Sequence, residues 1–329
     1  MFIRIKNLLL NKTYNTPTKN NLALFFVLFL PSLFIFVIGY TYISNILTKL
    51  TYANFEQIAT HSADILDSKL TELTAVGQDF SENIKFDKAI NSKNWKDTKE
   101  ILSVFKESSN EQFIDGLYFI DDIGTVQAES STSPDAVGKN FSFRDWFNGV
   151  FSTGKPYVSN AFQKIVEPKE NIVAVAIPVL GDDQKISGIL LLQVNLDHFL
   201  HLVKNMPVGL NGFVYTVDRS GQIVASPQYV PQGRIVNADN EPYITKVLAG
   251  EVGTSEIYDA QTDTKFIVSY HPSLYGWGVL VQQPSKNAFV ERIVVERFII
   301  ILFILVLVIN IFRIYMVKNI VESCECDHN

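Results

Sequence analysis

Residues 118–128 read YFIDDIGTVQA, and residues 215–225 read YTVDRSGQIVA. The two stretches share the pattern Tyr-x-apolar-Asp-x-x-Gly-x-apolar-x-Ala. Asp and Gly supply the chemistry of a tight turn, and the apolar residues on either side suit β-strands. Each stretch is therefore expected to fold as strand, turn and strand, so that the chain contains one motif twice.

The similarity between the two halves continues downstream of this motif. All matched positions lie between 90 and 97 residues apart, and the later ones are Phe147 with Tyr243, Gly154 with Gly250, Pro178 with Pro272, and GILLLQV (188–194) with GVLVQQ (278–283). One match arises easily by chance, whereas five at similar spacing indicate an internal repeat. The sequence predicts two tandem α/β modules, each a small antiparallel sheet with a helix. Residues 195–205 are expected to form the helix that joins them.

Upstream of the repeat, residues 43–80 carry apolar side chains at steps of three and four, and their first glycine is Gly77. This spacing predicts one long helix, about 55 Å in length at 1.5 Å per residue, continuous with the apolar segment before it. Such a helix either packs along a domain or pairs with a second copy of itself, and the sequence leaves both open.

Two segments are apolar enough to cross a membrane, which takes about 20 residues. Residues 22–46 contain no charged side chain, and a nearly continuous apolar run at 298–312 is flanked by Arg297 and Arg313. The arginines can extend their charged ends to the membrane surface. Alternatives are buried core helices or, for the first segment, a cleaved signal peptide, for which it is too long. We expect transmembrane helices at 22–46 and 293–317.

The charges indicate how these segments are oriented. Four basic residues and no acidic one precede the first segment, which predicts a cytoplasmic N-terminus. Two spans of the cytoplasmic (inner) membrane then return the C-terminus to the cytoplasm and place residues 47–292 outside. The chain has a formal net charge of −6 and no basic stripe, so nucleic acid is not an expected partner.

The expected organisation is α/β with two flanking transmembrane helices. From the N-terminus it comprises a cytoplasmic segment (1–21), transmembrane helix 1 (22–46), a long stalk helix with a helical lead-in (47–110), a membrane-distal module with its linker helix (111–205), a membrane-proximal module (206–292), transmembrane helix 2 (293–317) and a short cytoplasmic tail (318–329).

This combination resembles the double Cache domain, the extracytoplasmic, PAS-like sensor of bacterial transmembrane receptors. The long helix and the two sheet modules fit this domain in order and length over residues 43–292, and the second span follows them. The resemblance implies a receptor that feeds a histidine kinase, a diguanylate cyclase or a chemotaxis system. The 12 residues after Val317 are too few for a signalling domain. The chain is therefore expected to be a truncated gene product, a fragment, or a subunit that signals through a separate partner.

The resemblance also implies a ligand site. In relatives that bind amino acids, an Arg-x-Trp-Tyr run holds the ligand carboxylate, and this chain has Arg144, Trp146 and Phe147 there. A wall tyrosine, followed two residues later by Asp, corresponds to Tyr157, with Ser159 in place of the Asp. In a purely structural alternative, Arg144 pairs with a local acid while Trp146 and Phe147 fill the core.

The departures from this signature affect the acidic half of the site. Gln193 stands where the family has the aspartate that takes the ligand ammonium, and Ser159 replaces the second aspartate. A carboxylate stabilises a buried ammonium far better than a neutral amide does. These departures favour a ligand with a carboxylate or similar anion and weaken the case for an amino acid; Gln193 is suited instead to a hydroxyl or carbonyl of the ligand. Tyr118, on the preceding strand, is expected to contribute a phenol.

Other candidate sites are weaker. Asp197, His198 and His201 lie close together on the predicted linker helix, and the tail at 324–328 holds two cysteines, an aspartate and a histidine. Either group has metal-ligand chemistry, but a solvated helix face and a free chain end are the simpler interpretations. No metal and no cofactor is expected.

In the second module, Tyr243, Tyr258 and Trp277 either line a second pocket or pack in the core. The absence of an Arg-x-Trp run there favours the core. The sequence contains no phosphate-binding GK[ST] loop, no HExxH, no GxSxG and no Cys/His nucleophile pair, so it is not expected to be an enzyme.

These features together predict a membrane receptor subunit that binds a small anionic solute outside the cytoplasmic membrane and passes a conformational signal through its helices. A homodimer is expected because the stalk has heptad-like spacing. The alternative is a degenerate receptor that no longer binds ligand and acts by pairing with an intact receptor.

Overall fold

The computed structural model describes residues 17–108, 113–131, 134–165, 169–228, 235–260 and 262–326, with side chains between residues 25 and 316. The chain divides into two compact units: residues 51–288 form one, and the described parts of 1–50 and 289–329 form the other. The candidate metal ligands at 324–328 lie outside the described side chains.

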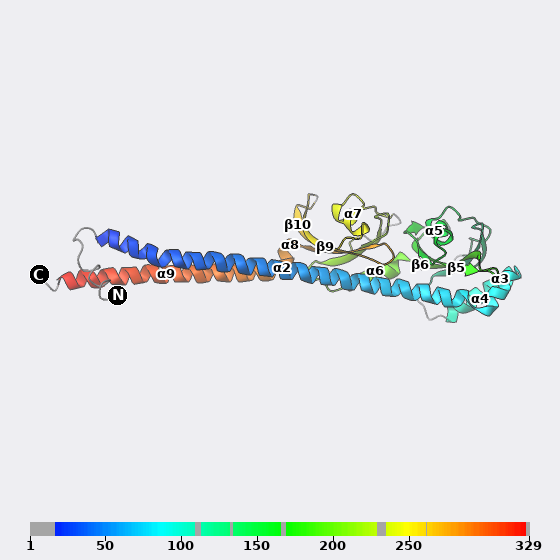
Figure 1. The fold of residues 1–329 in the computed structure, drawn as a ribbon, viewed down its shortest axis with the longest axis horizontal. Coiled ribbons are helices and arrows are strands. Elements are labelled where there is room, and N and C mark those ends of the chain that lie inside the picture. The colour runs from blue at the N-terminus through cyan, green and yellow to red at the C-terminus, as the bar shows by residue number, and fades with distance from the viewer. Residues whose placement is uncertain are drawn as a thin grey trace. The chain divides into compact units, whose positions relative to one another are not determined.

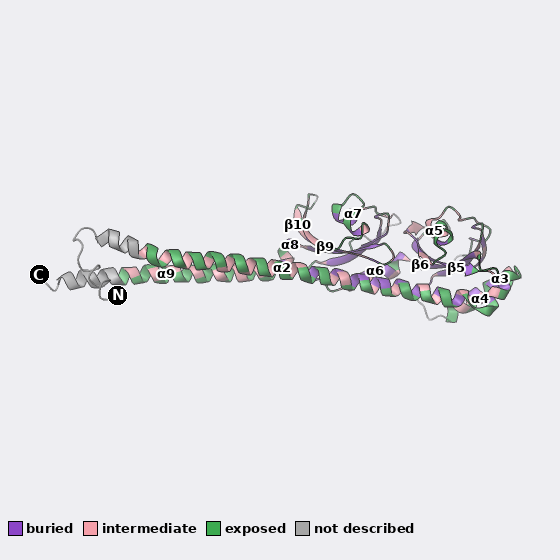
Figure 2. Cartoon of the chain, viewed as in Figure 1, coloured by how far each residue is buried: buried purple, intermediate pink, exposed green. Residues whose placement is uncertain are grey.

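Helix α2 (Pro17–Ser81) confirms the long N-terminal helix that the spacing predicts. From residue 55 to residue 80 one face of α2 is buried and the opposite face is exposed (Figure 2). The apolar residues of the buried face are Phe55, Ala59, Ala63, Leu66, Leu70, Leu73 and Phe80. These side chains share one side of a helix because they recur every three or four residues. The helix therefore packs along its own domain, one of the two arrangements left open by the sequence.

The chain reverses after α2 through two shorter helices, α3 (Ile84–Asn91) and α4 (Trp95–Ser108). Asn83 caps α3, because its side chain accepts hydrogen bonds from the backbone N–H groups of Lys85 and Phe86. The ring of Phe86 packs edge-on against Phe119 of the first sheet. This contact joins the helical lead-in to the module that follows.

The first module is built on an antiparallel sheet with the strand order β2-β1-β6-β5-β3, in which β4 also pairs with β5. The strands are β1 (Gly116–Asp121), β2 (Val126–Ser131), β3 (Tyr157–Val158), β4 (Phe162–Gln163), β5 (Asn171–Leu180) and β6 (Ile186–Asn195). Helix α5 (Asp145–Thr153) covers one face of this sheet, and α2 lies on the other (Figure 1). Both faces are therefore buried, and the strand run GILLLQV is almost continuously apolar for this reason.

The second module repeats this arrangement, with the strand order β8-β7-β11-β10-β9. Its elements are β7 (Phe213–Val217), β8 (Ile223–Ala225), α7 (Pro242–Leu248), β9 (Gly253–Asp259), β10 (Thr264–Pro272), β11 (Gly278–Pro284) and the short α8 (Ser285–Ala288). Helix α6 (Leu196–Lys204) joins the two modules. The prediction of two α/β modules with antiparallel sheets is thus confirmed.

The repeated motif forms the same turn in both modules. Asp121 Oδ1 accepts hydrogen bonds from the backbone N–H groups of Ile123 and Thr125, and Gly124 has a φ of 89°. Asp218 plays the same part after β7, where Gly221 has a φ of 77°. Glycine adopts a positive φ without steric cost, and the Asp carboxylate accepts the N–H groups of the turn, which explains why the motif keeps both residues.

The other unit contains the apolar part of α2 and helix α9 (Val290–Cys326). Both helices are long and apolar enough to cross a membrane, and almost no residue of their most apolar stretches is buried. Their apolar side chains therefore face outward, unlike those of a soluble core helix. Within this unit the rings of Phe36 and Phe303 stack with centroids 4.1 Å apart, and Ser44 Oγ donates to Glu296 Oε1 at 2.8 Å.

A donor-lined cavity in the first module

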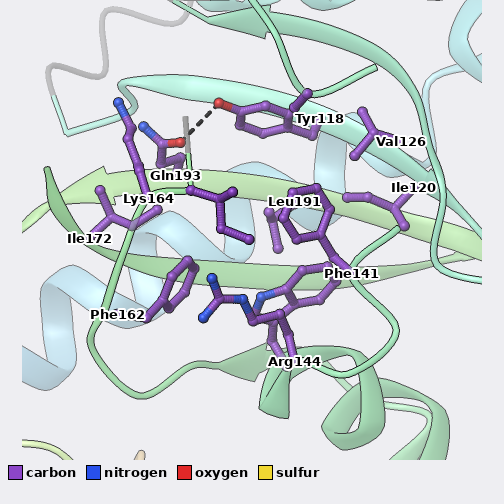
Figure 3. Close-up of a pocket in the computed structure, with 13 residues that line it drawn as sticks. Tyr118, Ile120, Val126, Phe141, Arg144, Phe162, Lys164, Ile172, Leu191 and Gln193 are labelled. Carbon is purple, nitrogen blue, oxygen red and sulfur yellow. Dashed lines mark hydrogen bonds between the residues drawn. The ribbon is translucent and has the colours of Figure 1, made fainter. Parts of the chain in front are cut away.

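A cavity opens between the sheet of the first module, the start of α5 and the segment around β4 (Figure 3). Its cavity volume is about 60 Å³. Apolar side chains form most of its lining, and the polar ones are few. The lining residues are Tyr118, Ile120, Val126, Ala136, Phe141, Arg144, Trp146, Phe162, Lys164, Ile165, Ile172, Leu191 and Gln193.

Arg144 directs its guanidinium into this cavity from the position just before α5. It occupies the N-cap of the helix but makes no side-chain capping bond. The guanidinium carbon lies 4.2 Å from the ring centre of Phe162, and the buried Nε–H has no hydrogen-bond partner in the described part of the chain. Burial lowers the pKa of Arg144, whereas the neighbouring Asp145 opposes this change. No described acidic side chain forms an ion pair with Arg144. The alternative in which Arg144 pairs with a local acid is therefore not what the structure shows.

Trp146 follows on the first turn of α5 and is 1% exposed. Its ring belongs to the apolar cluster between α5 and the sheet, so it fills the core as well as lining the cavity. Its indole Nε1–H is buried and unpaired within the described residues. An indole has no other polar atom. Because Trp146 lines the cavity, an acceptor that enters it can satisfy this N–H.

Tyr118 and Gln193 face the cavity from adjacent strands, β1 and β6. The Tyr118 hydroxyl donates to Gln193 Oε1 at 2.9 Å (Figure 3). Burial raises the pKa of Tyr118 to about 12, so the phenol keeps its proton at neutral pH. The side-chain oxygen of Gln193 is therefore occupied by Tyr118. Its buried Nε2 amide group has no hydrogen-bond partner among the described residues.

Lys164 adds a second cationic side chain that the sequence signature does not indicate. It lies just after β4, its side chain is 9% exposed, and its Nζ is 2.5 Å from Glu170 Oε2. An ammonium has three N–H donors, so two remain beyond this ion pair. Of the described side chains that line the cavity, none carries a carboxylate. The polar lining therefore offers mainly donors.

Three residues of the sequence signature lie beside the cavity rather than in its lining. Phe147 packs on Trp146 and Phe151. Tyr157 packs against Gly149, where an added Cβ would lie 2.3 Å from its ring. Ser159 is fully buried, accepts a hydrogen bond from the Ala174 N–H at 2.8 Å and donates to the Asn160 carbonyl at 2.7 Å.

The weaker candidates have structural surroundings. His198 lies 3.3 Å from Asp115 and stacks on Phe113, and the described residues contain no group of three or more His, Cys, Asp or Glu that is placed to hold a metal ion. Trp277 is fully buried. Tyr243 and Tyr258 border a wide, open hollow of the second module.

Two repeated PAS-like sheets with a donor-lined cavity in the first of them are the architecture of a ligand-binding sensor domain. The comparison with family models agrees: the dCache_1 model, described as a Cache domain, matches residues 43–291. The chain therefore belongs to the double Cache family. This family consists of sensor domains of receptors, and the comparisons indicate no enzyme family.

Solved structures of the same fold share little sequence with this chain. The ligand-binding domain of the Campylobacter jejuni chemoreceptor Tlp3, in complex with 4-methylisoleucine, has a TM-score of 0.57 at 14% identity and covers 73% of this chain and 93% of its own. The ligand-binding domain of the Pseudomonas aeruginosa PAO1 amino acid chemoreceptor PctB, in complex with L-Gln, has a TM-score of 0.55 at 14% identity and covers 72% and 92%. The extracellular domain of mmHK1S-Z2, described as a histidine kinase, has a TM-score of 0.57 at 12% identity and covers 72% and 98%. No curated protein matches the chain.

Proposed function

We propose that this chain is a membrane receptor subunit that binds a small carboxylate in the cavity of its first module, outside the cytoplasmic membrane. One observation carries the proposal: Arg144 Nε, Trp146 Nε1 and Gln193 Nε2 are three buried N–H groups around one cavity, each without a partner in the described chain. A buried donor left unpaired costs about 1–3 kcal/mol. A ligand that supplies acceptor oxygens removes this cost, and a carboxylate does so best.

Arg144 and Trp146 are the proposed carboxylate grip. A guanidinium matches both oxygens of a carboxylate, and the phenylalanine ring beneath it leaves its edge N–H groups free for a ligand. The indole N–H adds a third donor. The apolar lining suits a short hydrocarbon body between this grip and the strands, where Gln193 and Lys164 offer donors to a second oxygen.

The same lining disfavours a free amine. The Tlp3 and PctB domains are described with amino acid ligands, whereas here the polar groups near the strands are Gln193 Nε2, Lys164 Nζ and a protonated Tyr118. An ammonium in this position would lie near another ammonium without a carboxylate in the lining. We therefore propose hydroxy, oxo or dicarboxylic acids over amino acids.

The two apolar helices support the membrane placement. We propose that they span the cytoplasmic membrane, with residues 47–292 outside and the basic N-terminal segment inside. Occupancy of the cavity would bias the arrangement of the helices, because a ligand shifts a conformational equilibrium only by binding one state better. We also propose that two copies of the chain pair into a homodimer.

A thermal-unfolding screen of the full chain in detergent tests this function. The panel comprises acetate, propionate, pyruvate, lactate, succinate and benzoate beside amino acids, amines and sugars. A ligand at about 100 times its dissociation constant stabilises by about 2.7 kcal/mol, which raises the midpoint by about 5–10 °C in a domain of this size.

Three variants give the screen its controls. We expect a carboxylate to raise the midpoint of the wild type and of the exposed-site control Lys155→Ala, but not that of Arg144→Ala. Arg144→Lys should restore only part of the effect, because lysine lacks the two-pronged geometry. A panel without effect on well-folded protein would favour the degenerate receptor that acts through a partner.

A further inference from the structure

The segment 157–164 forms one wall of the cavity and has little regular structure of its own. It contains β3 and β4, which are two residues each. Phe162 and Lys164 at its end project into the cavity, and Phe162 lies under the Arg144 guanidinium (Figure 3). Strands this short provide few ladder hydrogen bonds, so the position of the wall depends on what else holds it.

The second module holds this wall through the turn that follows β7. Asp218 Oδ2 accepts a hydrogen bond from the Ala161 N–H at 2.9 Å, and Arg219 Nη1 donates to the Val158 carbonyl at 2.7 Å. The Arg219 guanidinium also lies 4.6 Å from the ring centre of Tyr157. Tyr157, Val158 and Ala161 of the wall are therefore each contacted by one of two adjacent residues of the second module.

These contacts between the modules are made only by the second copy of the repeated motif and not by the described residues of the first copy. Asp121 of the first module satisfies its own turn and accepts from Gln127, whereas Asp218 also bonds to the neighbouring module. At the next position the first module has Asp122 and the second has Arg219. Asp218 is fully buried, and its Oδ1 is fixed by the turn. The anchor is therefore held by three hydrogen bonds within its own turn.

The opposite side of the wall is tied to the carboxylate grip. Asp145, which directly follows Arg144, accepts a hydrogen bond from the Asn160 N–H at 2.7 Å through its Oδ2. The backbone of the wall thus runs between the start of α5 and the turn of the second module. Loosening one anchor would displace Phe162 and Lys164 relative to Arg144.

We propose that Asp218 and Arg219 are positioning residues of the ligand site, so that the second module sets the wall of the cavity in the first. This inference rests on the proposed function, in which the cavity is the ligand site. Coupling between two sites is reciprocal: if the contact between modules orders the wall for a ligand, a bound ligand strengthens the contact between modules.

Arg219 also lies next to the turn at Ser273–Gly276, which is hydrogen-bonded to α2. A Cβ at Gly276 would lie 3.0 Å from Arg219 Nε. In that turn the Ser273 hydroxyl and the Leu274 N–H, the latter at 3.0 Å, donate to the Asp67 carboxylate of α2. A displacement of Arg219 would therefore disturb the turn whose Ser273 and Leu274 bind Asp67 of the long helix.

Hydrogen exchange and lysine acetylation of the ligand-free full chain in detergent test the proposal. In Arg219→Ala, we expect the amides of 157–163 to exchange about ten-fold faster, the factor expected for loss of a charge-assisted hydrogen bond. Amides of β1 and β2 should keep their rates. Lys164, 9% exposed, should acetylate faster relative to the internal reference Lys185, which is 84% exposed.

Arg219→Lys keeps a donor and should restore part of the protection, which a general loss of stability would not show. Asp218→Asn supplies an independent variant if Arg219→Ala folds poorly, and Lys155→Ala is the control. Unchanged exchange at 157–163 and unchanged acetylation of Lys164 in both Arg219→Ala and Asp218→Asn would overturn the proposal. Because no ligand is added, the result is independent of whether the cavity binds a carboxylate.

Discussion

At the scale of single residues, the sequence predicted four of the polar side chains that line the cavity but missed Lys164, and it also predicted Tyr157 and Ser159, which do not line it. Arg144, Trp146, Tyr118 and Gln193 all face the cavity. Phe147 does not line it, because consecutive residues of a helix point about 100° apart. Lys164 follows a two-residue strand, a segment too short for any periodic pattern, so no sequence signal could assign it to the site.

Tyr118 gives a pH-dependent prediction. Because burial raises the pKa of Tyr118 to about 12 from 10.0, the folded protein keeps this proton between pH 10 and 12 while the unfolded chain loses it. Unfolding then releases a proton, so stability falls as the pH rises through this window and is unaffected below it. Two pKa units correspond to about 3 kcal/mol.

Urea unfolding of wild type and Tyr118→Phe at several pH values measures this effect, since phenylalanine has no proton to lose. Relative to the variant, the wild type should lose about 2–3 kcal/mol of unfolding free energy between pH 10 and 12. A constant difference between the two proteins across that range would show that Tyr118 titrates alike in the folded and unfolded chains.

Ser159 is predicted to act on stability rather than on the ligand. Its hydroxyl accepts a hydrogen bond from the buried Ala174 N–H, so Ser159→Ala should cost about 1–3 kcal/mol in unfolding free energy. The midpoint shift caused by a bound carboxylate should be retained, because Ser159 does not line the cavity. Loss of that shift in a stable variant would instead assign Ser159 to the site.

At the scale of elements, the repeated Asp and Gly predicted both β-turns because their chemistry is local. The hydrogen bonds of Asp121 and Asp218 within their own turns bear this out. The spacing of apolar residues likewise predicted the long helix. It could not decide what the helix packs against, because a buried stripe has the same period whether it faces its own domain or a second copy.

Asp67 is predicted to fasten α2 to the second module. It is 9% exposed and accepts from both the Ser273 hydroxyl and the Leu274 N–H. Asp67→Ala leaves these donors unpaired and should lower the unfolding free energy of the full chain by about 1–3 kcal/mol. The adjacent, exposed Ser68→Ala is the matched control in urea unfolding. Equal stability of the two variants would show that the contact contributes nothing.

At the scale of the whole molecule, the proposed topology places the unit of apolar helices in the membrane and residues 51–288 in the aqueous phase outside it. Residues 25–46 and 290–316 expose apolar side chains along both helices. Apolar surface of this length is unfavourable in water and suits a lipid environment. In the proposed topology, the basic residues of 1–21 keep the N-terminus in the cytoplasm.

Cysteine labelling in intact cells tests this orientation after Cys324 and Cys326 are replaced by serine. A membrane-impermeant maleimide should label Lys185→Cys, an exposed position of the first module, without permeabilisation. It should label Lys12→Cys only after permeabilisation. The reverse pattern would mean that the sensor domain faces the cytoplasm.

The most direct test of the central claim is the indole N–H signal of Trp146 in the full chain labelled with ¹⁵N-tryptophan. The three tryptophans give three signals, which single Trp→Phe variants assign, and the fully buried Trp277 is an internal control. We predict that a carboxylate from the panel shifts the Trp146 signal downfield, leaves Trp277 in place and has no effect in Arg144→Ala. A carboxylate that stabilises the protein but leaves the Trp146 signal unmoved would contradict the account.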